Sequence, residues 1–599
     1  MVIDTSLYPA TFQAQLLSLI DDLDNQTDGV IIHSDNFQAL NLLQARYQEQ
    51  VKCIYIDPPY NTEKDRSEGK FIYKDNYPHS TWLSLMYDRA IYARNLMKTI
   101  GVISFSIDEV EVSKSWEVFK EIFGEKNFAT DFIWEKKKKP SFLHKNVGKL
   151  NDYIITFVKD YKKTFPFSVE MTTEGKKTPL NNSGNNLSTL KFPAYSVKFN
   201  IPNCIIEPQD MSEGSIKTEL LNHVIIKNGS NENEFTLKGE FRYSQQKLNE
   251  IIANNEELYI SKLPFRPNHI KSGGEIKKMK NIFSPNHYEM ETNEDASKQI
   301  IDLFNKEEFK NPKPVKLVSY LIKSVTYEHK SDLILDYFAG SGTTAHAVIN
   351  LNREDQGKRK YILVEQGEYF DTVLKPRIQK VVYAKDWKAG KPENPDNLNG
   401  ISQLVKVLKL ESYEDTLNNL VLKNAEGQKD WVNMPEEVRS DYLLNYLLEV
   451  ESRGSLLNTD HFIDPFNYQL NIASDSAGAY QPQTIDLVET FNYLIGLKVH
   501  FVDDQREKRG WVLVKGEQLN GKKVLIIWRD CKRLNYAEIS QLFDKLDINP
   551  NDNEFDLIYL NGDHSIASQT QTLATDGELV QSLNLRSIEE TFLRLMFEE

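Results

Sequence analysis

The chain has 599 residues and a formal net charge of −15. This length is too great for one ordinary domain and suggests about three to four. Apolar residues make up 40% of the chain and charged residues 27%, which excludes a disordered chain and indicates an ample core. We expect neither a signal peptide nor a membrane span, because we see no charged leader and no run of about 18 apolar residues. Three cysteines without disulfide or zinc spacing suit a reducing cytoplasm.

After an N-terminal segment, residues 1–27, strands alternate with helices. The pattern predicts strands at 29–33, 51–56 and 102–107, and helices at 36–49, from Ser80 or Thr81 to about 99, and at 110–123. Gly101 is expected to end the second of these helices. This alternation implies a parallel sheet with helices on both faces, so residues 28–160 are interpreted as one half of an α/β domain.

Residues 161–310 lose this rhythm. They are rich in Asn, Ser, Lys and Gly, with short strand-like runs such as 224–226, and are interpreted as an insertion or a separate domain. Their aromatic residues are expected to form a core rather than to stack on bases: Phe192, Tyr195, Phe199 and Tyr243.

The α/β pattern resumes in residues 311–385, with a helix at 316–325, a strand at 333–337, a helix from Thr343 and a strand at 361–364. A Pro/Gly/Asn/Lys linker follows at 386–399. Residues 400–599 form a further region, with helices expected near 435–450 and a hairpin near 511–528.

The negative net charge looks unsuited to a nucleic-acid partner, but the charges are unevenly distributed. Residues 134–330 hold 31 Lys+Arg and 24 Asp+Glu, an excess of +7 that leaves −22 for the rest of the chain. Phosphate binding depends on the local field, although such an excess is equally compatible with ordinary surface variation. The candidate phosphate contacts are Lys136, Lys137, Lys138, Lys139, Lys277, Lys278 and Lys280, with a solvated face as the alternative.

The segment Asp57-Pro58-Pro59-Tyr60 follows an apolar strand and suits the methylation of an exocyclic amino group. The Asp57 carboxylate and the Pro58 carbonyl can each accept one amino hydrogen, which turns the nitrogen lone pair outward and stabilises the developing positive charge. The two prolines fix the backbone. Tyr60 offers a flat surface to a base pulled out of the duplex.

A second loop, 338–343, lies between a strand and a helix and reads Phe-Ala-Gly-Ser-Gly-Thr. Its glycines let the backbone approach a ligand, and the helix N-terminus offers N–H groups to a carboxylate. Glu365, at the end of the next strand, can accept hydrogen bonds from ribose hydroxyls. The loop matches neither a dinucleotide fingerprint nor a P-loop, so S-adenosylmethionine fits better. An ordinary structural turn is the alternative for this loop alone.

Together these loops resemble the catalytic and cofactor motifs of amino-DNA methyltransferases. The catalytic motif comes first and a long insertion precedes the cofactor motif, which is the permuted order of the beta group, whose insertion holds the target-recognition domain. The sequence around these loops, at 51–62 and 336–348, is similar to the Mod subunits of type III restriction–modification systems. Two C-terminal segments, 409–415 and 447–454, are similar to the same subunits.

The resemblance implies a Rossmann-like α/β methyltransferase fold with circularly permuted motif order and a target-recognition domain at 161–310. It also implies a C-terminal α+β region, 400–599, for dimerisation and partner docking, with a structural cap on the catalytic domain as the alternative. It implies methyl transfer from S-adenosylmethionine to adenine N6 in double-stranded DNA, by a homodimer that acts with a Res helicase–nuclease subunit. It places the amino-group site at Asp57, Pro58, Pro59 and Tyr60. It places the cofactor at Asp35, Lys313, Pro314, Asp336, Phe338, Ala339, Gly340, Ser341, Gly342, Thr343 and Glu365.

Other interpretations remain open. Cytosine-N4 methylation shares the amino-group geometry, and a non-catalytic DNA-recognition subunit would keep the fold; RNA or free nucleotides are further possible substrates. The eleven histidines show no metal-ligand spacing, so no metal is expected. Residues 516–523 nearly match a P-loop, but their flanks predict a hairpin around an Asn-Gly turn. We therefore expect DNA cleavage, if any, to come from a second polypeptide.

Overall fold

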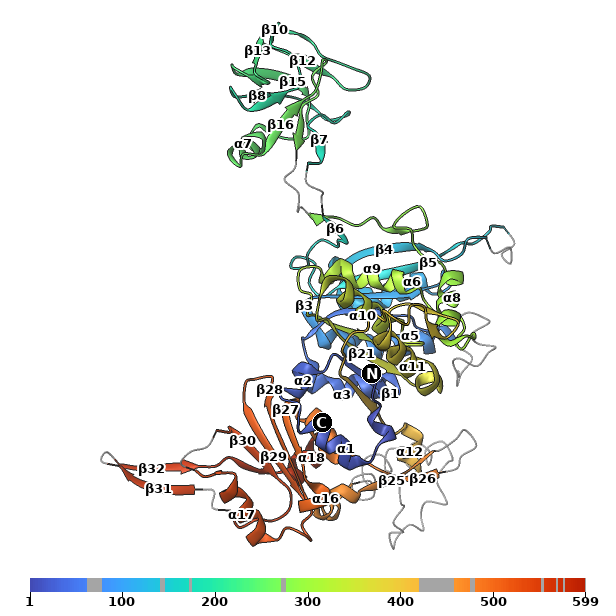
Figure 1. Cartoon of the computed structure of the whole chain (residues 1–599), viewed down its shortest axis with the longest axis vertical. Coiled ribbons are helices and arrows are strands. Elements are labelled where there is room, and N and C mark those ends of the chain that lie inside the picture. Colours follow the sequence, from blue (N-terminus) through green and yellow to red (C-terminus); the bar gives the residue numbers. More distant parts are fainter. Residues whose placement is uncertain are drawn as a thin grey trace, which may run out of the picture. The chain divides into compact units, whose positions relative to one another are not determined.

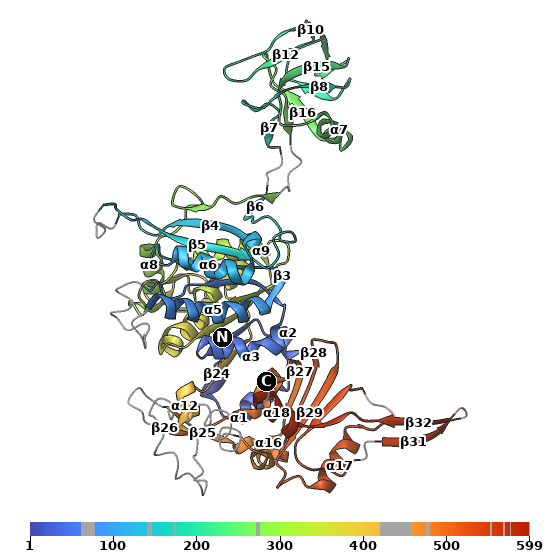
Figure 2. The same ribbon diagram turned by 180° about the vertical axis from the view of Figure 1, so that it is seen from behind.

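The computed structural model describes residues 1–61, 78–140, 146–171, 175–270, 276–419, 457–473, 480–550, 554–566, 569–574 and 577–597. The chain forms two compact units (Figures 1 and 2). The first comprises Met1–Phe165 with Lys280–Glu599, and the second comprises Pro166–Met279. Within the described residues, no helix has the length and apolar character that a bilayer crossing requires.

A nine-stranded sheet organises the first unit, in the order β19-β4-β5-β3-β2-β20-β21-β1-β24. Its strands are β1 (Gly29–His33), β2 (Val51–Ile56), β3 (Met97–Ile107), β4 (Phe128–Glu135), β5 (Asn151–Val158), β19 (Ile282–Phe283), β20 (Leu333–Asp336), β21 (Lys360–Glu365) and β24 (Val405–Lys409). The strands from β3 to β24 are parallel, whereas β5 runs antiparallel to both β3 and β4. The predicted parallel sheet is therefore confirmed at its centre and is mixed at one edge. β2 is buried along its whole length, as expected of a central parallel strand.

Helices cover both faces of this sheet (Figures 1 and 2). The apolar stripes of α3 (Asn36–Tyr47), α5 (Pro78–Leu96) and α6 (Val112–Phe123) share one core with the strands. On the other face lie α9 (Val315–Thr326), α10 (Thr343–Asp355) and α11 (Lys375–Tyr383). The expectation that Gly101 ends a helix is wrong: α5 already ends at Leu96, because Met97 pairs with Val51 and is fully buried in the sheet.

The second unit is shorter than the predicted insertion, 161–310. Residues 280–310 belong to the first unit, because β19 pairs with β4 and the chain then forms α8 (Asn293–Phe304). The second unit contains a seven-stranded sheet, β10-β13-β14-β9-β16-β17-β7, and a four-stranded sheet, β11-β12-β15-β8. Their bounds are β7 (Lys177–Pro179), β8 (Leu187–Phe192), β9 (Val197–Phe199), β10 (Cys204–Ile206), β11 (Gln209–Asp210), β12 (Thr218–Leu220), β13 (Val224–Lys227), β14 (Ser230–Asn231), β15 (Phe235–Glu240), β16 (Glu257–Ile260) and β17 (Asn268–Ile270). It also holds α7 (Gln245–Ala253) and the pair β6 (Glu170–Met171) and β18 (Ile276–Lys277).

Two expectations about the second unit change with its structure. Phe192 and Phe199 are buried in its core as predicted and Tyr243 packs against that core, but Tyr195 is 72% exposed and is not a core residue. Residues 166–279 hold 14 Lys+Arg and 13 Asp+Glu. The positive excess of 134–330 therefore lies mostly in the flanking segments of the first unit.

The C-terminal region does not begin at residue 400 as predicted. β24 belongs to the central sheet, since it pairs in parallel with β1 along its whole length. The predicted linker, 386–399, contains a short hairpin of β22 (Trp387–Lys388) and β23 (Lys391–Pro392). α12 (Tyr413–Asn418) follows, and the helices expected near 435–450 lie outside the described residues.

A second, five-stranded sheet forms the core of the described C-terminal residues, in the order β27-β28-β29-β30-β33. Its strands are β27 (Leu497–Asp504), β28 (Trp511–Gln518), β29 (Lys523–Arg529), β30 (Leu557–Leu560) and β33 (Leu585–Ser587). The helices are α15 (Leu487–Leu494), α16 (Arg506–Arg509), α17 (Tyr536–Lys545) and α18 (Ile588–Phe597). Two further hairpins are β25 (Gln469–Ala473) with β26 (Tyr480–Thr484), and β31 (Gln569–Ala574) with β32 (Gly577–Ser582). The hairpin expected near 511–528 is confirmed as β28 and β29, with Gly521 at φ +81 in its turn, so 516–523 is not a P-loop.

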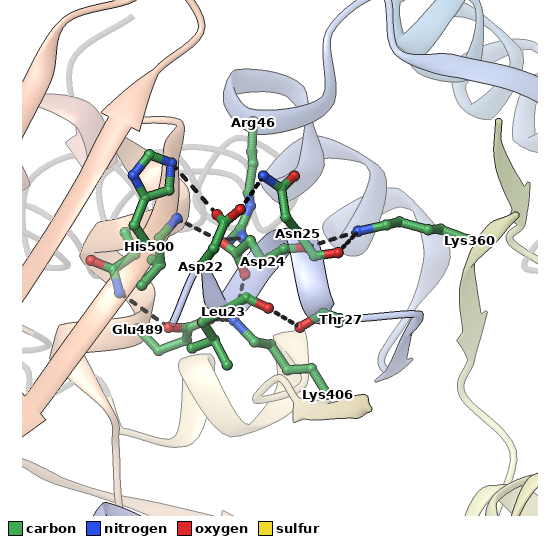
Figure 3. A network of polar contacts seen from close by, with 12 residues as sticks. Asp22, Leu23, Asp24, Asn25, Thr27, Arg46, Lys360, Lys406, Glu489 and His500 are labelled. Carbon is green, nitrogen blue, oxygen red and sulfur yellow. Dashed lines mark hydrogen bonds and ion pairs between the residues drawn. The ribbon is translucent and has the colours of Figure 1, made fainter. Parts of the chain in front are cut away.

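A buried polar cluster joins the N-terminal segment and α3 to the C-terminal region (Figure 3). Asp24, in α2 (Leu23–Gln26), forms an ion pair with Arg46 and accepts a hydrogen bond from the Val499 backbone N–H. Lys406 Nζ lies 3.4 Å from Asp24 Oδ1 and 2.7 Å from Glu489 Oε1. Although burial acts to raise it, the positive charges of Lys406 and Arg46 hold the pKa of Asp24 below its usual value. Charged groups therefore hold β27 and α15 against α3 and β24.

Candidate active site

Four of the predicted site segments lie at the ends of four neighbouring parallel strands. Asp57 comes directly after β2, the Phe338–Thr343 loop follows β20, Glu365 ends β21, and Asp35 follows β1. These strands are adjacent in the order β2-β20-β21-β1. Because the carboxyl ends of parallel strands meet at one edge of a sheet, the structure brings the four segments together there. This edge is the usual ligand site of an open α/β sheet.

The Asp-Pro-Pro-Tyr loop is held from both sides. Trp82 Nε1, on α5, donates to the Pro59 carbonyl at 2.7 Å. The Tyr60 hydroxyl donates to Asp152 Oδ2 at 3.3 Å. Asn61 takes a left-handed backbone at φ +55, and its amide donates to the buried Glu111 carboxylate at 2.6 Å. The Pro58 ring is buried, while the Asp57 side chain keeps 28% of its surface exposed. The loop therefore presents Asp57 from a fixed backbone.

Lys313 connects this loop with the glycine loop. Its ammonium lies 2.5 Å from Asp57 Oδ1 and 4.8 Å from the centre of the Tyr60 ring. Its backbone carbonyl accepts a hydrogen bond from Thr343 Oγ1 at 3.3 Å. Pro314 then forms the N-cap of α9. The predicted residue pair Lys313–Pro314 thus lies between the two loops, with the lysine directed at Asp57.

The glycine loop needs glycine at two positions. Gly340 has φ +53 and Gly342 has φ +82, a left-handed backbone that costs other residues free energy. A side chain at Gly342 would also lie 3.3 Å from the Leu374 side chain. Gly342 is the N-cap of α10, so the loop leads directly into a helix N-terminus. Ala339, Ser341 and Thr343 are buried around it.

Glu365 faces the glycine loop. Its Oε2 accepts the Gly340 backbone N–H at 2.8 Å. Its Oε1 accepts the backbone N–H groups of Gln366 and Gly367 and the Tyr369 hydroxyl, at 2.9, 2.8 and 2.9 Å. These donors orient the carboxylate beside the loop, where it was expected as a ribose acceptor.

Asp336 is a buried residue that forms hydrogen bonds with the start of the loop and of α10. It is buried, and its carboxyl group accepts the Phe338 backbone N–H at 3.1 Å and the Thr344 hydroxyl at 2.5 Å. Burial raises the pKa of Asp336 to about 7, against the lowering effect of these two hydrogen bonds. These hydrogen bonds fix the start of the glycine loop, and the contact of Asp336 with the cofactor stays a prediction.

Asp35 caps α3 near the same edge. Its Oδ1 accepts the Phe37 backbone N–H at 2.8 Å, and Arg89 lies 3.4 Å from Oδ2. The side chain is partly exposed, so its outer surface remains accessible to a ligand. Arg89 also donates to Asn36 Oδ1, whose amide donates to the Tyr337 carbonyl at 3.0 Å. This chain of contacts ties the start of α3 to the end of β20.

Two buried residues of the site do not stand out in the sequence. Arg377, on α11, donates to Ser341 Oγ at 2.7 Å and to Thr343 Oγ1 at 3.0 Å, and burial lowers its pKa to about 9. Asp152, on β5, contacts Tyr60 and Lys136. Neither residue lies in a recognisable motif. Arg377 lies on α11, after Glu365, and a search of that helix for polar residues would have identified it as a candidate.

The candidate phosphate contacts separate into lysines that form ion pairs with carboxylates and lysines for which the structure shows no such pair within its described residues. Lys136 forms ion pairs with Asp152 and Asp108 and its side chain is only 18% exposed, so its prediction as a phosphate contact is not supported. Lys138 pairs with Asp295, and Lys277 with Glu170. Lys139, Lys278 and Lys280 are exposed, and Lys137 is half-buried. Among the described residues, no group of three or more His, Cys, Asp or Glu side chains could hold a metal ion.

A family model described as DNA methylase matches residues 51–375. The type III StyLTI Mod subunit of Salmonella typhimurium is 30% identical over 392 residues, which cover 59% of this chain and 55% of that protein. The EcoPI Mod subunit of Escherichia phage P1 is 29% identical over 394 residues, 58% of each protein. The chain thus matches little more than half the length of these curated relatives.

Among solved structures, the cytosine-N4-specific PvuII DNA methyltransferase aligns with a TM-score of 0.30 and 13% identity, over 59% of this chain and 86% of that chain. The strand-end loops described above lie within the residues that the family model matches, except for Asp35. Since this match spans more than half of the 599 residues, the chain belongs to the DNA methylase family.

Proposed function

We propose that this chain transfers the methyl group of S-adenosylmethionine to the N6 amino group of an adenine in double-stranded DNA. The observation that carries the proposal is the contact of Lys313 with both site loops, at Asp57 and at Thr343. An acceptor for amino hydrogens and a glycine loop for the cofactor thus stand at the ends of adjacent strands, β2 and β20. Membership of the DNA methylase family supports the same reaction.

The residues at this edge fit S-adenosylmethionine. The left-handed glycines of the loop let the backbone approach a ligand, and the N-terminus of α10 offers amide groups to the cofactor carboxylate. Glu365 would accept hydrogen bonds from the ribose hydroxyls, and Asp35 would accept a hydrogen bond from the amino group of the cofactor adenine. When bound, the cofactor supplies an electrophilic methyl group on sulfonium sulfur.

The Asp-Pro-Pro-Tyr loop acts on the target base. The Asp57 carboxylate and the Pro58 carbonyl accept the two amino hydrogens, which directs the nitrogen lone pair away from the ring plane and stabilises the charge that develops on nitrogen. The Tyr60 ring stacks on the base after it leaves the duplex. Because Lys313 already contacts Asp57 Oδ1, the incoming amino group has to share or displace this contact.

We assign target recognition to the second unit, Pro166–Met279, and phosphate contacts to four lysines: Lys278 and Lys280, where the chain leaves this unit, with Lys137 and Lys139 on the segment after β4. The near balance of acidic and basic residues within 166–279 means that this assignment depends on base contacts more than on net charge. Alanine at all four lysines should weaken DNA binding most at low salt, where phosphate contacts contribute most.

We also propose that the chain is the modification subunit of a type III system, acting as a homodimer with a Res helicase–nuclease partner. This rests on the similarity to the StyLTI and EcoPI Mod subunits. Sedimentation of the purified chain would report a dimer. A chain that stays monomeric at all concentrations, or that forms no complex with a co-expressed Res subunit, would contradict this part of the proposal.

The reaction is tested by incubating the chain with DNA and labelled S-adenosylmethionine, followed by mass spectrometry of the nucleosides. N6-methyladenine supports the proposal. N4-methylcytosine would mean that the shared amino-group geometry serves cytosine instead, and label in neither nucleoside would favour a non-catalytic recognition subunit. Sequencing of the methylated DNA then gives the recognition site.

A further inference from the structure

Asp152 is a buried carboxylate that contacts the aromatic residue of the catalytic loop. It lies near the start of β5, which pairs antiparallel with both β3 and β4. The residue is 2% exposed, and its Oδ2 accepts the Tyr60 hydroxyl at 3.3 Å. That distance is longer than a typical O–H···O bond, as is common for site hydrogen bonds that shorten when substrate binds.

Lys136 holds Asp152 from the opposite side. Its ammonium forms an ion pair with Asp152 Oδ1 and lies 3.5 Å from Asp108 Oδ2. Lys136 directly follows β4, in which Trp134 is the register partner of Asp152. The antiparallel pairing of β4 with β5 therefore turns this lysine toward the site. A buried carboxylate between a lysine and a phenol keeps one orientation, because both of its oxygens have a hydrogen-bond donor.

The charges around Tyr60 favour a protonated phenol. Burial, together with the carboxylates of Asp57 and Asp152, raises the pKa of Tyr60 well above its usual value. Burial also raises the pKa of Asp152, whereas the ammonium groups of Lys136 and Lys313 lower it. The phenol is thus a hydrogen-bond donor at neutral pH. Its hydroxyl is directed at Asp152, and the Lys313 ammonium lies 4.8 Å from the centre of its ring.

We propose that Asp152, oriented by Lys136, is a positioning residue that holds the Tyr60 ring in the orientation needed to stack on the target base. This inference rests on the proposed methyl transfer, because it assigns to Tyr60 the stacking role in that reaction. Asp152 acts through its contact with the hydroxyl of Tyr60.

A double-mutant cycle tests this, with Asp152→Ala, Tyr60→Phe and the double variant. Phenylalanine keeps the ring and removes the hydroxyl. In the native background, Asp152→Ala should lower kcat/KM for DNA about tenfold, the scale of a hydrogen bond to a charged acceptor. In the Tyr60→Phe background the same substitution should change it by less than about twofold. Equal losses in both backgrounds would overturn the inference, because Asp152 would then act independently of the hydroxyl.

Two further readouts separate positioning from general structure. With 2-aminopurine at the target base, Asp152→Ala should reduce the quenching caused by stacking, while the Kd for S-adenosylmethionine stays within about twofold. The matched control is Asp131→Ala, an exposed aspartate on neighbouring β4, which should change neither quantity. Quenching by Asp152→Ala equal to that of the native chain would overturn the inference.

The same double-mutant cycle can be measured through the free energy of unfolding of each variant. Asp152→Asn replaces Asp152→Ala if the alanine variant does not fold. Coupling between positions 60 and 152 is expected there as well, and additive effects would contradict the contact. If the native chain transfers no methyl group, the proposed reaction fails, and this stability cycle alone decides whether Asp152 positions Tyr60.

Discussion

The Lys313 ammonium lies 2.5 Å from Asp57 Oδ1, although the two residues are 256 positions apart in the sequence. Lys313 is 10% exposed and precedes α9, whereas Asp57 follows β2 in the other half of the domain. The same residue accepts a hydrogen bond from Thr343 in the glycine loop. One lysine therefore links the two loops whose order in the sequence is permuted, and it does so at the carboxylate assigned to the target amino group.

Lys313→Met should lower kcat/KM for methyl transfer by about ten- to a hundredfold, because Asp57 loses the charge that orients it. In an Asp57→Asn background the same substitution should add less than about twofold, since the pair acts as one unit. Labelled methyl transfer to DNA measures both. The matched control is Lys316→Met, which removes a half-buried lysine of α9 that contacts Glu289 and not Asp57. Losses that simply multiply would show that Lys313 acts elsewhere.

Glu365→Gln should weaken S-adenosylmethionine binding by about ten- to a hundredfold, because hydrogen bonds to a charged acceptor contribute about 1.5–3 kcal/mol. Isothermal titration calorimetry gives the Kd directly. Glu368→Gln, at an exposed glutamate in the turn after β21, should leave the Kd unchanged. A Glu365→Gln chain that binds the cofactor as tightly as the native chain would rule out the ribose assignment.

Asp336 predicts a pH dependence of stability. Its pKa rises from an ordinary 3.8 to about 7 on burial, so the folded chain binds this proton more tightly than the unfolded chain. The stabilisation is fully present below pH 3.8 and is lost as the pH rises through about 7. Between pH 5 and 8 the native chain should lose stability relative to Asp336→Asn, by at most about 1.4 kcal/mol per pH unit. Urea unfolding of both chains measures the difference, and parallel pH profiles would contradict it.

Asp24→Asn should lower the free energy of unfolding by about 3 kcal/mol, because Arg46 and Lys406 stay buried without their shared carboxylate. The loss should fall on the junction of α3 with the C-terminal region (Figure 3), where hydrogen exchange of the β27 amides would increase. Asp21→Asn, an exposed neighbour, is the control. Unchanged exchange in β27 would mean that the cluster does not hold the junction.

The central α/β domain follows from local patterns. Apolar runs such as 51–56 and 333–336 predict buried strands, and the polar or glycine residues that follow them fall at the carboxyl ends of those strands. A parallel sheet then brings these ends together, which is why the candidate site could be predicted from the sequence. Even the P-loop-like segment 516–523 is correctly interpreted, because its flanks alternate as strands.

The remaining features depend on which strands become neighbours. Lys136 looks like part of a solvated lysine run, and only the antiparallel pairing of β4 with β5 turns it toward Asp152. Gly101 looks like a helix end, yet it lies within β3 because the residues before it already pair with β2. Side-chain pairs such as Lys313 with Asp57 arise from sheet order, on which local periodicity carries no information.

The most direct test of the account compares methyl transfer to DNA by the native chain and by Asp57→Ala, with S-adenosylmethionine binding measured in parallel. The native chain should label adenine N6. Asp57→Ala should lose at least about a thousandfold in kcat, because the amino nitrogen loses its charged acceptor, and should keep its cofactor Kd within about threefold. An Asp57→Ala chain that transfers methyl groups at the native rate would contradict the assignment of this loop to the reaction.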